Sequence, residues 1–345
     1  MSETSDQGPV DELLATAEVI VIVGPGGVGK TTTAAALGAR AAIHHDRRVQ
    51  VITIDPARRL AQALGVDELM EEEILVPTPS GRFWASMVNM SRSWDRLVER
   101  HAPTAEVRDD LLANPLYRSL TTRFVQSHDY IALDHLVDQS DDDRFDLVII
   151  DTPPSVHALD VLDAPAKMED FFGSRLLTWL TAPYRSRLSQ IAAAPFLSIA
   201  ERLLGGPFLA DIADFFWLFS QLQKSFADRT RLVQERLFAP TTKYVVVQTP
   251  ETGPAEQASI LLAELQRRAH QPSLSVINRA LPPAVAKLTP KDLGLVEDPE
   301  LRRRVEDLRR RAQTAAHGPA GIPVVEVPDS PTALNSVIEL ARLVH

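Results

Sequence analysis

The residues best suited to chemistry form a glycine-rich turn near the start of the chain, Gly24-Pro25-Gly26-Gly27-Val28-Gly29-Lys30-Thr31-Thr32. A short apolar run precedes this turn and an alanine-rich helical pattern follows it, which is the context of a phosphate-binding loop. Glycines let successive backbone N–H groups point at phosphate oxygens, and the start of the helix adds the positive end of its dipole. The residues that we expect to contact a nucleotide in this loop are Gly26, Gly27, Val28, Gly29, Lys30, Thr31 and Thr32.

Two side chains of the loop have distinct chemical roles in this hypothesis. Lys30 is predicted to contact the β- and γ-phosphates of ATP and so to take part in catalysis. The hydroxyl of Thr31 is predicted to bind Mg²⁺. A dehydrogenase is disfavoured, because the Lys-Thr pair fits a phosphate loop better than a dinucleotide-binding turn.

Two carboxylates follow apolar runs that are predicted to be strands. Asp151 ends the run LVIID, which places a carboxylate beside the phosphate loop, where it would hold Mg²⁺ through water. Asp55 follows the run VITI and lies at the carboxyl edge of the predicted sheet, where ligands of open α/β folds bind. We expect Asp55 to orient or deprotonate the attacking water and to be a third metal-site residue beside Thr31 and Asp151. The alternative role for Asp55 is the N-cap of a helix that begins at Pro56.

Short β-branched runs alternate with longer helical patterns along most of the chain. Near-continuous apolar strands separated by helices predict an α/β fold with a doubly wound, mainly parallel sheet, covered on both faces. The predicted strands are Val19–Val23, Val49–Ile54, Trp84–Val88, Asp146–Ile150, Tyr244–Val247, Leu274–Ile277 and Val324–Val327.

The alternation breaks at 91–143 and 166–238, where helical spacing replaces the strand signals. We expect these two segments to form an inserted all-helical subdomain, and 15–90, 144–165 and 239–345 to form the core. Residues 1–14 are expected to be a flexible lead.

The second helical segment contains nine of the twelve phenylalanines of the chain. An apolar stripe follows one face of a predicted long helix. It consists of Phe208, Ile212, Phe215, Phe216, Phe219, Leu222 and Phe226. Such a stripe indicates either a packed helical core or an exposed groove for an apolar client helix or a membrane-protein partner.

Composition excludes several classes of function. The formal net charge is −10, so the basic footprint of a general nucleic-acid or anionic-membrane binder is missing. The chain has no cysteine, which excludes disulfides, thiolate metal sites and a cysteine nucleophile. Charge-free runs reach only about 13 or 14 residues, too short to span a membrane, and the first residues lack the positive charge of a secretory signal. We expect a cytoplasmic protein.

The last ten residues, SVIELARLVH, form an amphipathic pattern. A membrane-surface helix and a helix packed on the core both have this pattern. Because Arg342 is its only certain cation, packing on the core is favoured.

Five motifs occur in the order and spacing of the ArsA family of anion-pump ATPases and related targeting ATPases for tail-anchored membrane proteins, which the chain resembles. They are Gly24–Thr32, Asp55–Leu60 (DPARRL), Asp151–Leu159 (DTPPSVHAL), Val245–Glu251 (VVVQTPE) and Ser275–Pro282 (SVINRALP). The resemblance implies a P-loop ATPase core with a helical subdomain, working as a dimer with ATP and Mg²⁺. It also implies that Asp55 activates water in switch I, that Asp151–Leu159 is switch II, and that the Asn278 amide contacts adenine.

Three departures from the family pattern affect the expected activity. The family loop reads GKGGVGKT, and its first lysine reaches the nucleotide of the other subunit, whereas this chain has Pro25. Trans-acting cations of this kind are worth about 10³ to 10⁵ in rate. Without cysteine, neither a thiolate arsenite site nor an inter-subunit zinc clamp can form. Arg58 and Arg59 stand in switch I, as solvated helix residues or as a replacement cation within the same subunit.

The leading hypothesis is an Mg²⁺-dependent ATPase, either a homodimer or one half of a heterodimer with a lysine-bearing ArsA-like paralogue. The alternative is a nucleotide-binding regulatory subunit with little hydrolysis of its own, which Pro25 favours and the retained Lys30, Thr31, Asp55 and Asp151 disfavour. A ParA- or MinD-like positioning protein is disfavoured by the overall acidity and the two helical insertions.

Overall fold

The computed structural model describes residues 8–54, 59–69, 72–118, 125–152, 206–316, 321–329 and 336–344, with a few isolated positions between 163 and 202. The chain divides into two compact units. The sheet unit comprises Met1–Val88, Asp138–Leu159 and Phe238–His345. The helical unit comprises Asn89–Val137 and Asp160–Leu237.

The sheet unit is built on one mainly parallel sheet, which confirms the predicted α/β class. The described strands are β1 (Val19–Val23), β2 (Val49–Thr53), β3 (Ile74–Leu75), β4 (Phe83–Met87), β5 (Leu147–Asp151), β6 (Thr242–Gln248), β7 (Pro272–Ala280) and β8 (Val324–Pro328). Their order is β3-β4-β2-β5-β1-β6-β7-β8. Every described pair is parallel except β3 with β4.

All seven predicted strands form, with ends that differ from the prediction by at most three residues. Every residue of β1, β2 and β5 is buried, as expected for central strands covered on both faces. The sequence analysis missed β3, because two residues are too few to show an alternating pattern.

One face of the sheet is covered by α1 (Pro9–Thr16), α2 (Lys30–His44), α3 (Arg59–Leu64) and α17 (Val337–Ala341). Their buried side chains join alternate strand residues such as Ile20 and Ile22 in a single apolar cluster. Because Val10, Leu13 and Leu14 of α1 belong to this cluster, the flexible lead expected for residues 1–14 is wrong from Pro9 onward. Helix α17 packs on α2 and buries Val337, Leu340 and Ala341, which confirms that the C-terminal pattern packs on the core.

Helix α13 (Thr252–Arg267) packs on β6 and β7 with Ala258, Leu261, Leu262 and Leu265. None of these four side chains belongs to the apolar cluster of the first face. Since strand residues alternate between faces, α13 covers the opposite face of the sheet.

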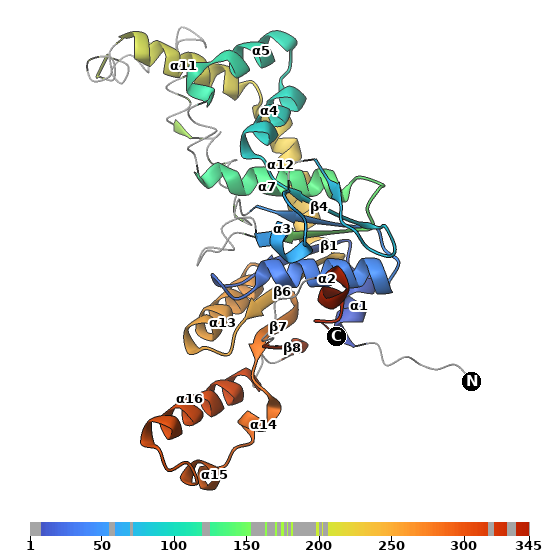
Figure 1. Cartoon of the computed structure of the whole chain (residues 1–345). Helices are drawn as coiled ribbons and strands as arrows, with labels where there is room; N and C mark the ends of the chain where they lie inside the picture. The colour runs from blue at the N-terminus through green and yellow to red at the C-terminus, as the bar shows by residue number, and fades with distance from the viewer. Residues whose placement is uncertain are drawn as a thin grey trace. The chain divides into compact units, whose positions relative to one another are not determined.

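Three helices lie between β7 and β8: α14 (Pro283–Ala286), α15 (Pro290–Gly294) and α16 (Pro299–Ala316). They form an orange to red arm beyond the ends of β7 and β8 (Figure 1). Helix α14 packs against α16, and Gln313 Nε2 donates a hydrogen bond to the Ala286 carbonyl at 3.1 Å.

The helical unit contains, in its described part, α4 (Met90–His101), α5 (Ala105–Ala113), most of α7 (Val125–Ser140), α11 (Gly206–Ser220) and α12 (Gln223–Phe238). The single long helix predicted for the aromatic stripe is wrong. Helix α11 ends at Ser220, and the amides of Gln221 and Leu222 bond three residues back, to Leu218 and Phe219. This tighter turn separates α11 from α12.

The aromatic stripe is packed inside the helical unit at its described central positions. Phe215 and Phe219 are each 5% exposed, Leu222 is fully buried, and Phe226 is 1% exposed. The rings of Phe215 and Phe219 stack at 5.7 Å, and Trp94 lies 6.2 Å from Phe219. Of the two alternatives left open by the sequence, these side chains support the packed core. No helix in the described ranges has the length and hydropathy needed to cross a bilayer.

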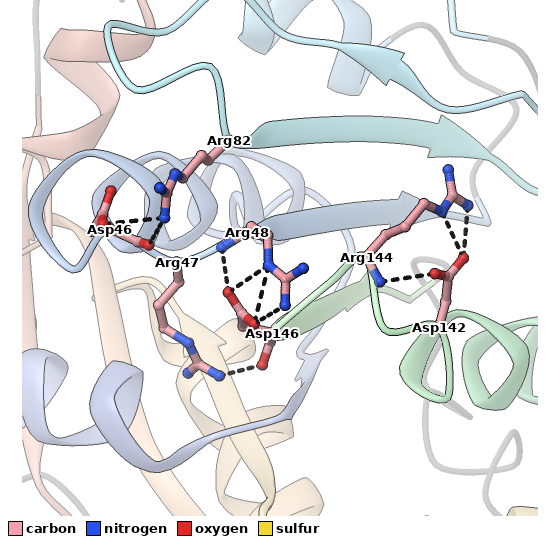
Figure 2. A network of polar contacts seen from close by, with 7 residues as sticks. All are labelled: Asp46, Arg47, Arg48, Arg82, Asp142, Arg144 and Asp146. Carbon is pink, nitrogen blue, oxygen red and sulfur yellow. Dashed lines mark hydrogen bonds and ion pairs between the residues drawn. The ribbon is translucent and has the colours of Figure 1, made fainter.

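At the amino edge of the sheet, charged residues form a set of contacts that we call the amino-edge network (Figure 2). Its members come from the segments just before β2, β4 and β5. They are Asp46, Arg47, Arg48, Arg82, Asp142, Arg144 and Asp146. Arg48 binds the Asp146 carboxylate through Nε at 3.1 Å and Nη2 at 2.5 Å, and its backbone N–H donates to the same carboxylate at 2.8 Å.

Arg47 has a different role in this network. Its guanidinium donates to the main-chain carbonyls of Leu14, at 2.6 Å, and of Ala17 and Asp146. Burial lowers the pKa of Arg47, while the charges of Asp146 and Glu18 act in the opposite direction. Arg47 therefore ties the end of α1 to the start of β5.

Candidate nucleotide-binding site

The phosphate loop begins at the carboxyl edge of the sheet, where three neighbouring strands end. Strand β5 lies between β1 and β2, and Asp151 at its end pairs with Ile22 of β1 and Thr53 of β2. The loop leaves β1 at Gly24 and enters α2 at Lys30. Because the strands are parallel, the ends of β1, β2 and β5 bring their polar residues to one place.

Two glycines of the loop are required by close contacts. A Cβ added to Gly24 would lie 2.2 Å from the Val247 carbonyl oxygen of β6. Gly29 has a φ of 98°, and a Cβ there would lie 2.1 Å from the side-chain nitrogen of Asn278. A larger residue at Gly24 would clash with the backbone of β6, and one at Gly29 would be strained by the positive φ and would displace the Asn278 side chain.

Asn278, the predicted adenine contact, reaches the loop from β7. Its Nδ2 donates a hydrogen bond to the Val28 carbonyl at 2.8 Å. The structure thus gives Asn278 a role that the sequence did not reveal, which is to hold the phosphate loop in place. The adenine contact stays a prediction.

Lys30 is 6% exposed, and its ammonium lies against the loop itself. Its Nζ donates to the Gly24 carbonyl at 2.9 Å and to the Pro25 carbonyl at 3.0 Å. The N-cap of α2 is Gly29, which offers no side-chain acceptor to the first N–H groups of the helix. The buried ammonium and the positive end of the α2 dipole together make the loop attractive to anions.

Thr31 and Asp151 meet directly beneath the loop. The Thr31 hydroxyl donates to Asp151 Oδ2 at 2.7 Å, and the Thr53 hydroxyl donates to the same oxygen at 3.2 Å. Asp151 is 1% exposed. Nearby, the Thr152 hydroxyl donates to the Ile22 carbonyl at 2.6 Å, which fixes the chain just after β5.

The Thr31 hydroxyl and the Asp151 carboxylate fit a magnesium site. Mg²⁺ prefers oxygen ligands and is usually bound through one or two protein side chains, with water and substrate phosphates completing its coordination. Within the residues that the structure describes, no group of three or more His, Cys, Asp or Glu side chains forms a self-sufficient metal cage. The donors present are those expected of a metal that arrives with a nucleotide.

A pocket of about 450 Å³ opens over the loop. The loop and α2 contribute Gly27, Gly29, Lys30, Thr31 and Thr32 to its lining, and the remaining lining residues are Arg59, Gln62, Ala63, Thr152 and Arg279. Three of these side chains are cationic, and none is acidic. The pocket is therefore suited to a polyanion such as a nucleotide triphosphate.

Two cations line this pocket besides Lys30. Arg59 is exposed at the start of α3 and lines the pocket, so both roles considered for it stay open. Arg279 was not identified from the sequence. The only signal for it was its place directly after Asn278, because the strand irregularity that exposes it does not appear in a sequence pattern.

Several predicted site residues lie outside the described residues. They include Asp55 and Arg58 of switch I and positions 153–159 of switch II. The roles predicted for them from the sequence stay predictions. The last described residue before Asp55 is Ile54, whose backbone N–H donates to the Asp151 carbonyl at 3.3 Å.

Comparison with known proteins gives a consistent result. The family model for an anion-transporting ATPase matches residues 17–292. An ATPase ASNA1 homolog of Entamoeba histolytica is 22% identical over 265 residues, 76% of each chain. A protein of the same name from Entamoeba dispar is 24% identical over 268 residues, again 76% of each chain. The ATPase GET3 of Kluyveromyces lactis is 26% identical over 198 residues, which cover 53% of this chain and 55% of the relative.

Proposed function

The chain belongs to the anion-transporting ATPase family, and from this membership we propose that it binds ATP with Mg²⁺ at the phosphate loop and hydrolyses it. The observation that carries the proposal is the 2.7 Å hydrogen bond between Thr31 and Asp151, beneath a loop that encloses the Lys30 ammonium. Phosphate-loop enzymes use a hydroxyl and a carboxylate so placed to hold Mg²⁺.

Each residue of the site has a specific task in this proposal. Lys30 exchanges the Gly24 and Pro25 carbonyls for phosphate oxygens, and the backbone N–H groups from Gly26 to Thr32 surround the phosphates. Thr31 and Asp151 would hold the metal, whose charge would offset the negative charge of the phosphates. Asp55 orients the attacking water and belongs to the metal site, and Asn278 contacts adenine while it holds the loop.

We also propose that the ATPase works as a dimer, and that Pro25 makes it one half of a heterodimer with a lysine-bearing paralogue. Pro25 is buried and has no charge or donor to offer a second subunit. Replacing Pro25 by Lys should raise the activity of the isolated chain if this cation is what it lacks, with Pro25→Ala as the control for removing the proline ring. A stable homodimer of the unaltered chain with normal turnover would contradict the heterodimer.

In this proposal, ATP hydrolysis is coupled to the helical unit, which would bind an apolar helix or a membrane-protein partner. The burial of Phe215, Phe219, Leu222 and Phe226 argues against these four side chains as the binding surface. A partner is expected to contact other parts of the helical unit.

A second function is favoured by one observation. Because Pro25 replaces the signature lysine, the chain could bind ATP as a regulatory subunit and hydrolyse it only slowly. In that case ATP binding would still depend on Lys30, but turnover by the chain alone would not exceed that of a Lys30→Ala variant.

The experiment that separates the two functions is steady-state Mg²⁺-ATP hydrolysis by the purified chain, with Lys30→Ala protein prepared identically as the blank. Turnover above the blank supports a self-sufficient ATPase. Lys30-dependent binding without turnover supports the regulatory subunit. Unchanged ATP affinity in the Lys30→Ala variant would contradict the phosphate-loop assignment itself.

A further inference from the structure

Arg279 has an unusual backbone for a residue inside a strand. Its φ is 55°, in the left-handed region that favours glycine. The other described non-glycine residues with positive φ, Asp46 and Ala269, lie just past the C-terminal ends of α2 and α13, where this conformation is common. Arg279 therefore needs a different explanation.

The explanation is an irregularity in the pairing of β7 with β8. Asn278 pairs with Val327 and Ala280 pairs with Pro328, so Arg279 is an extra residue between two consecutive pairs. Extra residues of this kind turn a side chain away from its expected direction, and they are frequent next to active sites. Here the extra residue follows Asn278, which binds the phosphate loop through Val28.

The result is that Arg279 lines the same pocket as Lys30, Thr31 and Thr32. Its guanidinium is exposed and makes no hydrogen bond or ion pair in the described part of the chain. This contrasts with Arg47 and Arg48, which are fully engaged by carbonyls and a carboxylate of the protein.

The carboxylate of Glu251 lies within electrostatic reach of Arg279. Burial raises the pKa of Glu251, but a hydrogen bond from Thr249, one from its own backbone, and the charges of Arg311 and Arg279 outweigh burial and hold the pKa below its usual value. Glu251 is not among the residues that line the pocket. No acidic side chain in the pocket lining competes with a ligand for the Arg279 guanidinium.

From these observations we propose that Arg279 is a phosphate-binding residue of the nucleotide site, supplied by the same chain that carries the phosphate loop. This inference rests on the proposed nucleotide binding and goes beyond it, because it assigns a phosphate contact from β7, outside the phosphate loop. The strained backbone at Arg279 places the guanidinium over the pocket, and the Asn278 hydrogen bond keeps that strand end in register with the loop.

The positive φ of Arg279 allows the loss of its charge to be tested without loss of stability. Replacing Arg279 by Gly removes the guanidinium and at the same time relieves the left-handed backbone, so the variant should fold and melt at the same or a higher temperature. Its affinity for Mg²⁺-ATP should fall about tenfold to a hundredfold, as expected for the loss of a charge-assisted hydrogen bond. Arg279→Lys should retain part of the affinity, since it keeps the charge. Arg303→Ala, on the exposed face of α16, is the matched control for loss of one positive charge.

Titration calorimetry with ATP, and competition by inorganic tripolyphosphate, distinguish the outcomes. Weaker binding of both ligands by Arg279→Gly, with no change in Arg303→Ala, supports a phosphate contact. Weaker ATP binding with unchanged tripolyphosphate binding would assign Arg279 to the base or ribose and overturn the proposal. Wild-type affinity in Arg279→Gly would also overturn it while leaving the proposed function intact. If the unaltered chain binds ATP no better than Lys30→Ala, the proposed function fails, and the role of Arg279 fails with it.

Discussion

Strand β5 has an aspartate just before its first residue and another at its end, and the two carboxylates are used in opposite ways. Asp146, at the amino edge, is bound by the Arg48 side chain and backbone. Asp151, at the carboxyl edge, is 1% exposed and accepts hydrogen bonds from the hydroxyls of Thr31 and Thr53. The carboxylate bound by arginine stabilises the fold, whereas the one that accepts from hydroxyls lies beside the phosphate loop, where its oxygens suit Mg²⁺.

The two edges also differ in what surrounds their arginines. At the amino edge, Arg47 and Arg48 end on carbonyls and a carboxylate of the protein (Figure 2). At the carboxyl edge, Arg279 lines a pocket with no acidic side chain in its lining. One sheet therefore has a structural edge and a ligand-binding edge, and the predictions below test that division.

The largest effect is expected for Asp151→Asn. We predict that hydrolysis falls by about 10² to 10³, comparable to the loss of one preorganised electrostatic group in other active sites. The free energy of unfolding should change little, because the substitution keeps the shape and removes a buried charge. Steady-state ATPase assays and urea denaturation measure the two quantities. Equal loss of stability and activity would place Asp151 with the structural residues instead.

At the amino edge, Arg47→Met should lower the free energy of unfolding by about 2 to 3 kcal/mol, because three main-chain carbonyls lose a charged donor. Arg82→Met is the matched control. The Arg82 side chain is 43% exposed, and in the described part of the chain its polar contacts are with the backbone and side chain of Asp46, so its loss should cost under about 1 kcal/mol. A similar cost for both variants would mean that the carbonyl contacts of Arg47 add nothing to stability.

Asp146→Asn makes the same chemical change as Asp151→Asn at the opposite end of β5. We expect a loss of about 1 kcal/mol in unfolding free energy, since the Arg48–Asp146 pair is bidentate but partly exposed. Hydrolysis should stay within about twofold of the unaltered chain. A large fall in activity without unfolding would show that the two edges are coupled.

The smallest effect concerns acid stability near the end of α2. Hydrogen bonds from Arg40 and His45, opposed in part by burial, lower the pKa of Asp11 from 3.8 to about 2. A depressed carboxyl pKa stabilises the fold above about pH 4, and this stabilisation is lost as the pH falls toward 2.

Asp11→Asn should therefore melt below the unaltered chain at pH 6, and the gap should narrow at pH 2 to 3. Thermal melts across that range measure it. A gap independent of pH would mean that Asp11 acts through packing or neutral hydrogen bonds.

Much of the site could be predicted from the sequence because the phosphate loop is a contiguous segment. Gly24–Thr32 supplies the turn, the ammonium and a hydroxyl within nine residues, and the apolar run before it identifies β1. Asp151 was found for the same reason, since a carboxylate at the end of a buried strand must lie at the carboxyl edge. The strands were found because central parallel strands are apolar throughout.

Features that depend on distant contacts escaped the sequence. Arg48 and Asp146 are 98 positions apart, and their pairing requires β2 and β5 to be neighbours. The turn between α11 and α12 contains no glycine or proline. The helical spacing of apolar residues continues across the turn, so the sequence predicted one helix. The same spacing does not indicate whether the aromatic stripe faces solvent or the core, because burial depends on which other helices pack against the stripe.

The sequence by itself determined the α/β class, the family and the position of the nucleotide loop, because each is specified by local residue patterns. Only the tertiary structure decided that Asn278 holds the loop, that Arg279 reaches the pocket, and that the aromatic stripe is buried. The physical reason is that these three features arise from strand register, a pairing irregularity and helix packing. Each of them exists only after segments far apart in the chain have come together.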